Sequence, residues 1–170
     1  MANEAVELNF RSVIKGISLT LRRHGFTRRG TAYRYLSEGN SAIIQVQRSR
    51  SSDNQVIRFT LNTGVISGRL LRGLAPDVSK SVEMHAHLRQ RIGCFLSPPR
   101  EKWWEIGATS DVAVVLDEIT PLLDDAAHYV ITHIADEQLI ALWESGRGPG
   151  LTEFQRLRNL SDLKAAMQVS

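Results

Sequence analysis

Hydrophobic residues recur at helical spacing near the start of the chain, between Asn3 and His24. They fall at Val6, Phe10, Val13, Ile14, Ile17 and Leu21. This spacing puts them on one face of a helix. Asn3 can cap the helix because its side chain accepts a backbone N–H, and Gly25 can end it because glycine tolerates a left-handed conformation. The pattern predicts an amphipathic helix across residues 3–24.

The segment after this helix changes to a two-residue period, which is typical of strands. Residues 31–49 hold two runs rich in β-branched and aromatic residues, joined at Glu38, Gly39 and Asn40. Glycine and asparagine accept the positive φ of a hairpin turn. These residues therefore predict a β-hairpin.

Residues 54–66 and 87–95 alternate in the same way and predict two more strands. The apolar side of the predicted sheet collects Ile44, Val46, Ile57, Phe59, Leu61, Leu88 and Ile92. The polar side collects Gln45, Gln47, Arg58, Thr60, Asn62, Arg89 and Arg91. Residues 101–106 are expected to be extended too, so that alternation buries Trp104 and leaves Trp103 partly exposed between two glutamates.

Beyond Gly107 the apolar positions return to a helical period. One long stripe covers residues 112–134 and contains Pro121, which either kinks a single helix or starts a second one. Residues 136–145 and 152–167 predict two further helices, separated by a glycine-rich loop. Residues 67–84 lack a firm period and are expected to form a loop with a short helical piece.

Helices at the ends and strands in the middle are the pattern of an α+β fold. Short connections favour an antiparallel meander of about four to five strands. We expect the N-terminal helix to precede this sheet and the C-terminal helices to pack on one of its faces. The 170 residues suit a single domain, residues 1–170.

Charge is distributed unevenly along the chain. Residues 1–107 hold 17 Lys and Arg against 8 Asp and Glu, whereas residues 108–170 hold 4 against 10. This asymmetry is expected either to be neutralised inside the fold or to attract an anionic partner, and the first alternative is favoured. The single cysteine excludes an internal disulfide framework, and no uncharged apolar run approaches the roughly 18 residues of a membrane span. We expect a cytoplasmic protein with no membrane partner.

Several short segments carry a resemblance to a known family: "GFTRRGTAYRY" after the first helix, "IIQVQRS", "FTLNTGV" with its Asn-x-Gly, "RIG" and the "WW" pair. Together they resemble the bacterial domain-of-unknown-function family DUF4304, over roughly residues 5–130. The resemblance supports the fold, and it implies no activity and no catalytic residues.

Candidate chemistry is sparse. His85 and His87, if on a strand, would project to the same face and start a zinc site, but further ligands would have to converge from Cys94, His128 or His133. Cys94 follows a glycine in an apolar run, so we expect it to be a small buried hydrophobe. No catalytic residue, metal ligand or cofactor is assigned.

The polar sheet face is the candidate contact surface. Its proposed residues are Gln45, Gln47, Arg58, Asn62, Arg89, Arg91 and Trp103. The leading hypothesis is a non-enzymatic binding or protein-interaction module, with a protein partner or a homodimer at this face. The second hypothesis is a nucleic-acid or nucleotide binder, for which Tyr33 and Tyr35 would be the sheet aromatics. A metal-dependent enzyme is the third.

Overall fold

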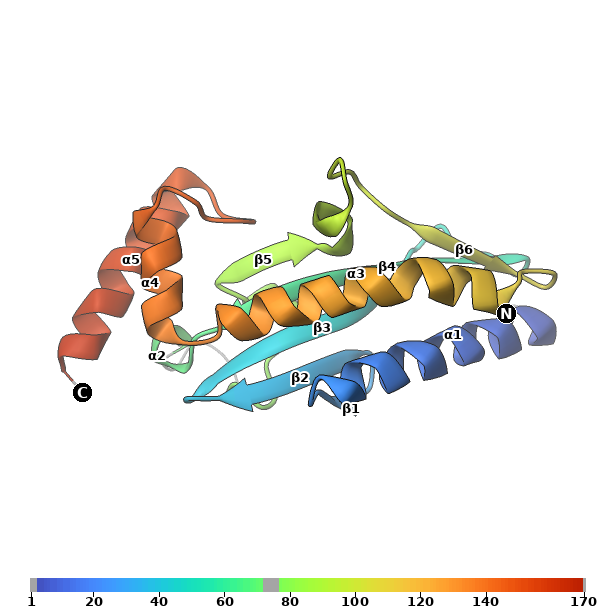
Figure 1. Ribbon diagram of the computed structural model, residues 1–170, viewed down its shortest axis with the longest axis horizontal. Helices are drawn as coiled ribbons and strands as arrows, with labels where there is room; N and C mark the ends of the chain where they lie inside the picture. Colours follow the sequence, from blue (N-terminus) through green and yellow to red (C-terminus); the bar gives the residue numbers. More distant parts are fainter. Residues whose placement is uncertain (1–2, 72–76, 170) are drawn as a thin grey trace.

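The computed structural model describes residues 3–71 and 77–169 and has helices at the two ends of the chain with the strands between them (Figure 1). Helix α1 (Glu4–Arg23) begins as predicted, because the Asn3 side chain accepts the N–H of Ala5 at 3.0 Å. The chain leaves the helix through Gly25, whose φ is 87°. The α+β prediction is confirmed.

The elements that follow α1 match the predicted order and add several short pieces. They are β1 (Thr27–Arg29), β2 (Ala32–Ser37), β3 (Asn40–Arg48), β4 (Val56–Ile66), α2 (Gly68–Leu71), the 3₁₀ turn η1 (Glu83–His85), β5 (Leu88–Arg91), the 3₁₀ turn η2 (Ile92–Phe95), β6 (Trp104–Gly107), α3 (Val112–Thr132), α4 (Asp136–Glu144) and α5 (Glu153–Gln168).

Strand β4 organises the sheet, because it is hydrogen-bonded along both of its sides. It pairs with β3 on one side, and on the other side β6 and β5 pair with successive parts of it, all antiparallel. The sheet order is β1-β2-β3-β4-β5, with β6 beside β4. The described sheet therefore has six strands, because β1 adds a short edge strand that the sequence pattern did not reveal.

One face of the sheet is covered by α1 and α3, which lie side by side across it (Figure 1). The seven apolar residues predicted to face the helices are all buried, at 5% exposure or less. Gly16 of α1 allows this close packing, because a Cβ there would lie 2.5 Å from the Leu116 side chain of α3. The core is therefore a sandwich of two helices on one sheet face.

Helix α3 runs unbroken through Pro121, so the sequence alternative of a second helix starting there is not realised. Helices α4 and α5 pack on each other beyond the end of the sheet and bury Trp143 (Figure 1). Within the described ranges, no helix is both long enough and apolar enough to cross a membrane.

The opposite face of the sheet is polar over only part of its area. A second apolar cluster lies there, formed by Ala32, Ile43, Ile66, Leu71 and Ala86. Arg34 also lies on this side, is 8% exposed, and donates from Nε and Nη2 to the Ser81 carbonyl at 2.9 and 2.7 Å. Helix α2 and the residues that precede β5, 77–87, thus cover one end of this face.

Two local expectations are wrong. The predicted strand at 87–95 ends at Arg91, and Ile92–Phe95 forms a 3₁₀ turn instead, in which the Gly93 carbonyl accepts the N–H of Leu96. Cys94 is exposed in this turn, not buried, because the turn breaks the alternation that would have directed its side chain inward.

A buried carboxylate joins four parts of the chain at the end of the sheet. Asp136, the first residue of α4, is 3% exposed and accepts from Asn40 Nδ2 at 2.8 Å and from Ser67 Oγ at 2.8 Å. Its second oxygen accepts from Arg69 Nη1 at 2.5 Å. A buried carboxylate is stable only with such donors, so these contacts fix where α4 meets the hairpin, β4 and α2.

Replacing this carboxylate is expected to destabilise the fold. Asp136→Ala leaves the buried donors of Asn40 and Ser67 without their acceptor, which should lower the free energy of unfolding by about 3 kcal/mol. Asp125→Ala removes an exposed carboxylate from α3 and is the matched control, with an expected effect within about 0.5 kcal/mol. Denaturant unfolding measures both, and equal midpoints for the two variants would contradict the role given to Asp136.

Candidate functional site

The structure brings the predicted contact residues onto one face of the sheet. Gln45 lies opposite Asn62, and Asn62 lies opposite Arg91, in adjacent strands. Asn62 Nδ2 donates to Gln47 Oε1 at 2.7 Å, and the N–H of Glu83 donates to Gln45 Oε1 at 3.1 Å. We call the surface formed by Gln45, Gln47, Arg58, Asn62, Arg89, Arg91 and Trp103 the polar face.

Each arginine of the polar face is paired with a carboxylate. Arg58 Nε lies 2.9 Å from Glu105, Arg89 Nε lies 2.8 Å from Glu83, and Arg91 Nη1 lies 2.5 Å from Glu101. Three cations matched by three anions give this face little net charge. The polar face is therefore less basic than the sequence indicated.

The two tryptophans occupy the environments that alternation predicted. Trp104 is 4% exposed, stacks on Phe59 with ring centroids 5.7 Å apart, and donates from Nε1 to Glu118. Trp103 is half-buried, donates from Nε1 to Glu101 at 3.1 Å, and has the Arg91 guanidinium 5.7 Å from its ring centroid. Trp103 therefore belongs to the polar face and Trp104 to the core.

A cavity of about 230 Å³ opens beside the polar face, between Gln47, Asn62, Glu83 and the start of β5. The glycine-rich loop after α4 closes one side of it, because the Arg89 N–H donates to the Pro149 carbonyl at 3.1 Å. Gly150 has a φ of 76°, and a Cβ there would lie 2.6 Å from Arg89 atoms. This loop thus lines a hollow as well as connecting two helices.

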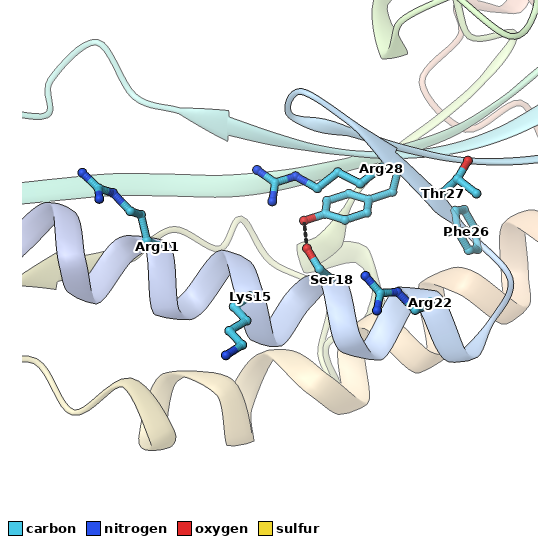
Figure 2. A pocket seen from close by; sticks show the side chains of 8 residues that line it. Arg11, Lys15, Ser18, Arg22, Phe26, Thr27 and Arg28 are labelled. Atoms are coloured by element: carbon cyan, nitrogen blue, oxygen red, sulfur yellow. Dashed lines mark hydrogen bonds between the residues drawn. The ribbon is translucent and has the colours of Figure 1, made fainter.

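The larger hollow lies on the other side of the sheet, between α1 and the β1–β2 hairpin. Figure 2 shows its cationic side chains, with Arg11, Lys15 and Arg22 on α1 and Arg28 on the strand opposite. The hollow measures about 620 Å³, which is within the usual range of ligand pockets. We call it the basic groove; its lining is completed by Ser18, Phe26, Thr27 and Tyr33.

The cations of the basic groove have no carboxylate partners in the part of the chain that the structure describes. Within the described residues, none of the ion pairs includes Arg11, Lys15, Arg22 or Arg28. Arg28 Nε donates only to the Gly30 carbonyl, at 2.9 Å. All four side chains are exposed, so they create a positive potential over an open hollow.

Tyr33 forms the floor of the basic groove without adding negative charge to it. Its hydroxyl shares a 2.8 Å hydrogen bond with Ser18 Oγ. Burial raises the pKa of Tyr33, while the Ser18 hydrogen bond and the Arg28 charge oppose that change. The phenol therefore stays neutral, and the groove keeps its net positive charge.

The basic groove follows from helical spacing together with tertiary packing. Arg11, Lys15, Ser18 and Arg22 recur every three or four residues, so they form one stripe beside the buried face of α1. That stripe was assigned no role from the sequence, although its spacing is visible there. The closing wall is not visible there, because only the fold brings Arg28 beside α1.

Comparison with family models gives one match. Residues 17–133 match DUF4304, a domain of unknown function. The chain belongs to the DUF4304 family. The match covers more than half of the chain, and it confirms the resemblance seen in the short segments. Searches of curated proteins and of solved structures give no match.

The DUF4304 segment contains most of both surfaces. It begins within α1 and ends just after α3, so it includes every residue of the polar face. Of the cations in the basic groove it includes Arg22 and Arg28, whereas Arg11 and Lys15 precede it. Asp136, the buried carboxylate at the start of α4, lies just beyond the end of the DUF4304 segment.

The two histidines considered for zinc lie in this segment, and the strand expected to align them is absent. His85 ends η1, and its Nδ1 accepts the N–H of Val82 at 3.1 Å. His87 Nδ1 accepts the N–H of Ser67 at 3.0 Å. Among the residues placed by the structure, no group of three or more His, Cys, Asp or Glu is suited to hold a metal.

Tyr33 and Tyr35, considered as aromatics of the polar face, belong instead to the core under the helices.

The environment of His87 predicts a pH dependence of stability. Burial lowers the pKa of His87 to about 4, despite the opposing charge of Asp136. The unfolded chain therefore binds this proton more readily, so the stabilisation is complete above about pH 6.5 and is lost as the pH falls toward about 4. The loss should be about 3 kcal/mol.

His87→Asn removes the titrating group and should flatten the pH dependence in this interval. His128→Asn, at an exposed position of α3, is the control and should keep the wild-type slope. Urea unfolding at several pH values measures the effect. An unchanged slope in His87→Asn would show that another group causes the acid sensitivity.

Proposed function

We propose that this DUF4304 chain is a binding domain that recognises a phosphate-bearing ligand in the basic groove. The observation that carries the proposal is the set of exposed cations, Arg11, Lys15, Arg22 and Arg28, that have no ion pair within the described chain. Arginine binds phosphate oxygens through its planar fork, and lysine binds them as a point charge. Repulsion among these like charges falls when an anion enters the groove.

The shape of the groove supports a ligand with more than one phosphate. Arg11 and Arg22 are separated by eleven residues of α1, which corresponds to roughly 16 Å along a helix. Among the described lining residues there is no carboxylate, imidazole or thiol. The guanidinium and ammonium groups present supply anion binding, which supports a binding module. The polar face is less suited to this role because its arginines already have partners.

Inorganic pyrophosphate is the simplest probe of the basic groove. Titration calorimetry at low ionic strength should detect its binding, and affinity should fall steeply as salt rises. The double variant Arg11→Glu with Arg22→Glu should weaken pyrophosphate binding by about tenfold or more.

The control has the same change in net charge. Arg23→Glu with Arg50→Glu replaces two exposed arginines that do not line the groove and should change affinity by less than about threefold. No pyrophosphate binding by the wild-type chain, or equal losses in the two double variants, would refute the proposal.

The polar face supports a second candidate function, which is contact with another copy of this chain. The specific observation is Trp103, a half-buried indole held between Glu101 and Arg91, and Arg91 also lines the cavity of the polar face. Alternating Arg–Glu pairs are self-complementary, since each cation of one copy can meet an anion of the other across a two-fold axis. An indole surrounded by such pairs is a typical anchor of a protein interface.

Sedimentation and thermal melts of two tryptophan variants test this second function. Trp103→Ala should shift a concentration-dependent dimer toward monomer while costing little stability. Trp104→Ala removes a core side chain and should cost about 3–5 kcal/mol of unfolding free energy. A wild-type chain that stays monomeric at high concentration would exclude self-association at this face.

A further inference from the structure

An apolar hollow adjoins the basic groove. It measures about 200 Å³ and lies between Phe10 and Ile14 of α1, Thr31 of the β1–β2 turn and Val46 of β3. Arg28 and Tyr33 line both this hollow and the groove. The two spaces therefore adjoin each other at these two residues.

The hollow differs from the groove in charge. Besides Arg28, which it shares with the groove, the hollow is lined by one other cation, Arg48, whose charge is paired with Glu7 at 2.9 Å. The Arg48 guanidinium carbon lies 5.7 Å from the centroid of Phe10, and that of Arg28 lies 5.9 Å from the centroid of Tyr33. Planar guanidinium groups beside aromatic rings provide flat surfaces on which another ring can stack.

We propose that the groove and the hollow together bind a nucleoside phosphate, with its phosphates among the groove cations and its base in the hollow. This inference rests on the proposed function of the groove and names its ligand class. A flat, uncharged base matches an apolar space with stacking surfaces, whereas the phosphates match the unpaired cations of the groove, with Arg28 at the border of the two spaces. Free nucleotides and the 5′-phosphorylated ends of nucleic-acid strands share this chemistry.

Calorimetry with paired ligands separates the base from the phosphates. Pyrophosphate probes the groove alone, and the four common ribonucleoside diphosphates add a sugar and a base. At least one nucleoside diphosphate should bind about tenfold more tightly than pyrophosphate, as expected for one stacked base. A 5′-phosphorylated tetranucleotide that binds more tightly still would identify a strand end as the ligand, and equal or weaker binding would identify the free nucleotide.

Two variants test whether the base lies in the hollow. Thr31→Phe places a ring in the hollow from an exposed turn position, and Thr109→Phe is the matched control at another exposed turn. Arg48→Lys keeps the charge that pairs with Glu7 and removes the planar group. Both hollow variants should remove the advantage of the nucleoside diphosphate and leave pyrophosphate binding unchanged.

The outcomes distinguish this inference from the proposed function. Pyrophosphate binding without any gain for nucleoside diphosphates overturns the nucleoside ligand and leaves the groove as an anion site. A gain that survives both Thr31→Phe and Arg48→Lys places the base elsewhere and also overturns the inference. Absence of binding by every probe overturns both proposals.

Discussion

The buried carboxylate of Asp136 holds α4, β3, the end of β4 and α2 together at one end of the sheet. An ionised group at 3% exposure is costly to bury, and here its cost is offset by donors from β3, from the residue after β4 and from α2. Because these donors come from distant parts of the chain, the carboxylate fixes their relative positions. Helix α2 is thereby held against one end of the sheet face that α1 and α3 leave open.

The distribution of ion pairs gives the two faces of the molecule different chemistry. On the polar face, Arg58, Arg89 and Arg91 are neutralised by nearby glutamates of neighbouring segments. Along α1 the exposed cations face another cation, Arg28, and uncharged residues of the hairpin. None of the described residues that line the groove is a carboxylate, so no comparable neutralisation occurs there. Sequence charge alone does not distinguish these cases, because pairing depends on which strands become neighbours.

Much of the fold was predictable, because the periodic patterns are long. The first helix, the hairpin, the alternation of β4 and the contrasting tryptophans follow from local spacing. The covering of the sheet face opposite α1 and α3 was harder to predict. Residues 41–44 are all buried, because β3 is covered on both of its faces at that point. The basic groove depends on a three-residue strand, β1, which is too short to give a periodic signal.

The glycine-rich loop after α4 also has a consequence for aggregation. Exposed sheet edges present unpaired backbone groups that can recruit another strand. At the β5 edge the Pro149 carbonyl accepts the Arg89 N–H, and Gly150 allows the loop to approach closely. At the opposite edge, β1 is only three residues long and ends in two arginines. The β5 and β1 edges therefore both resist strand addition, which disfavours a continuous intermolecular sheet at either of them.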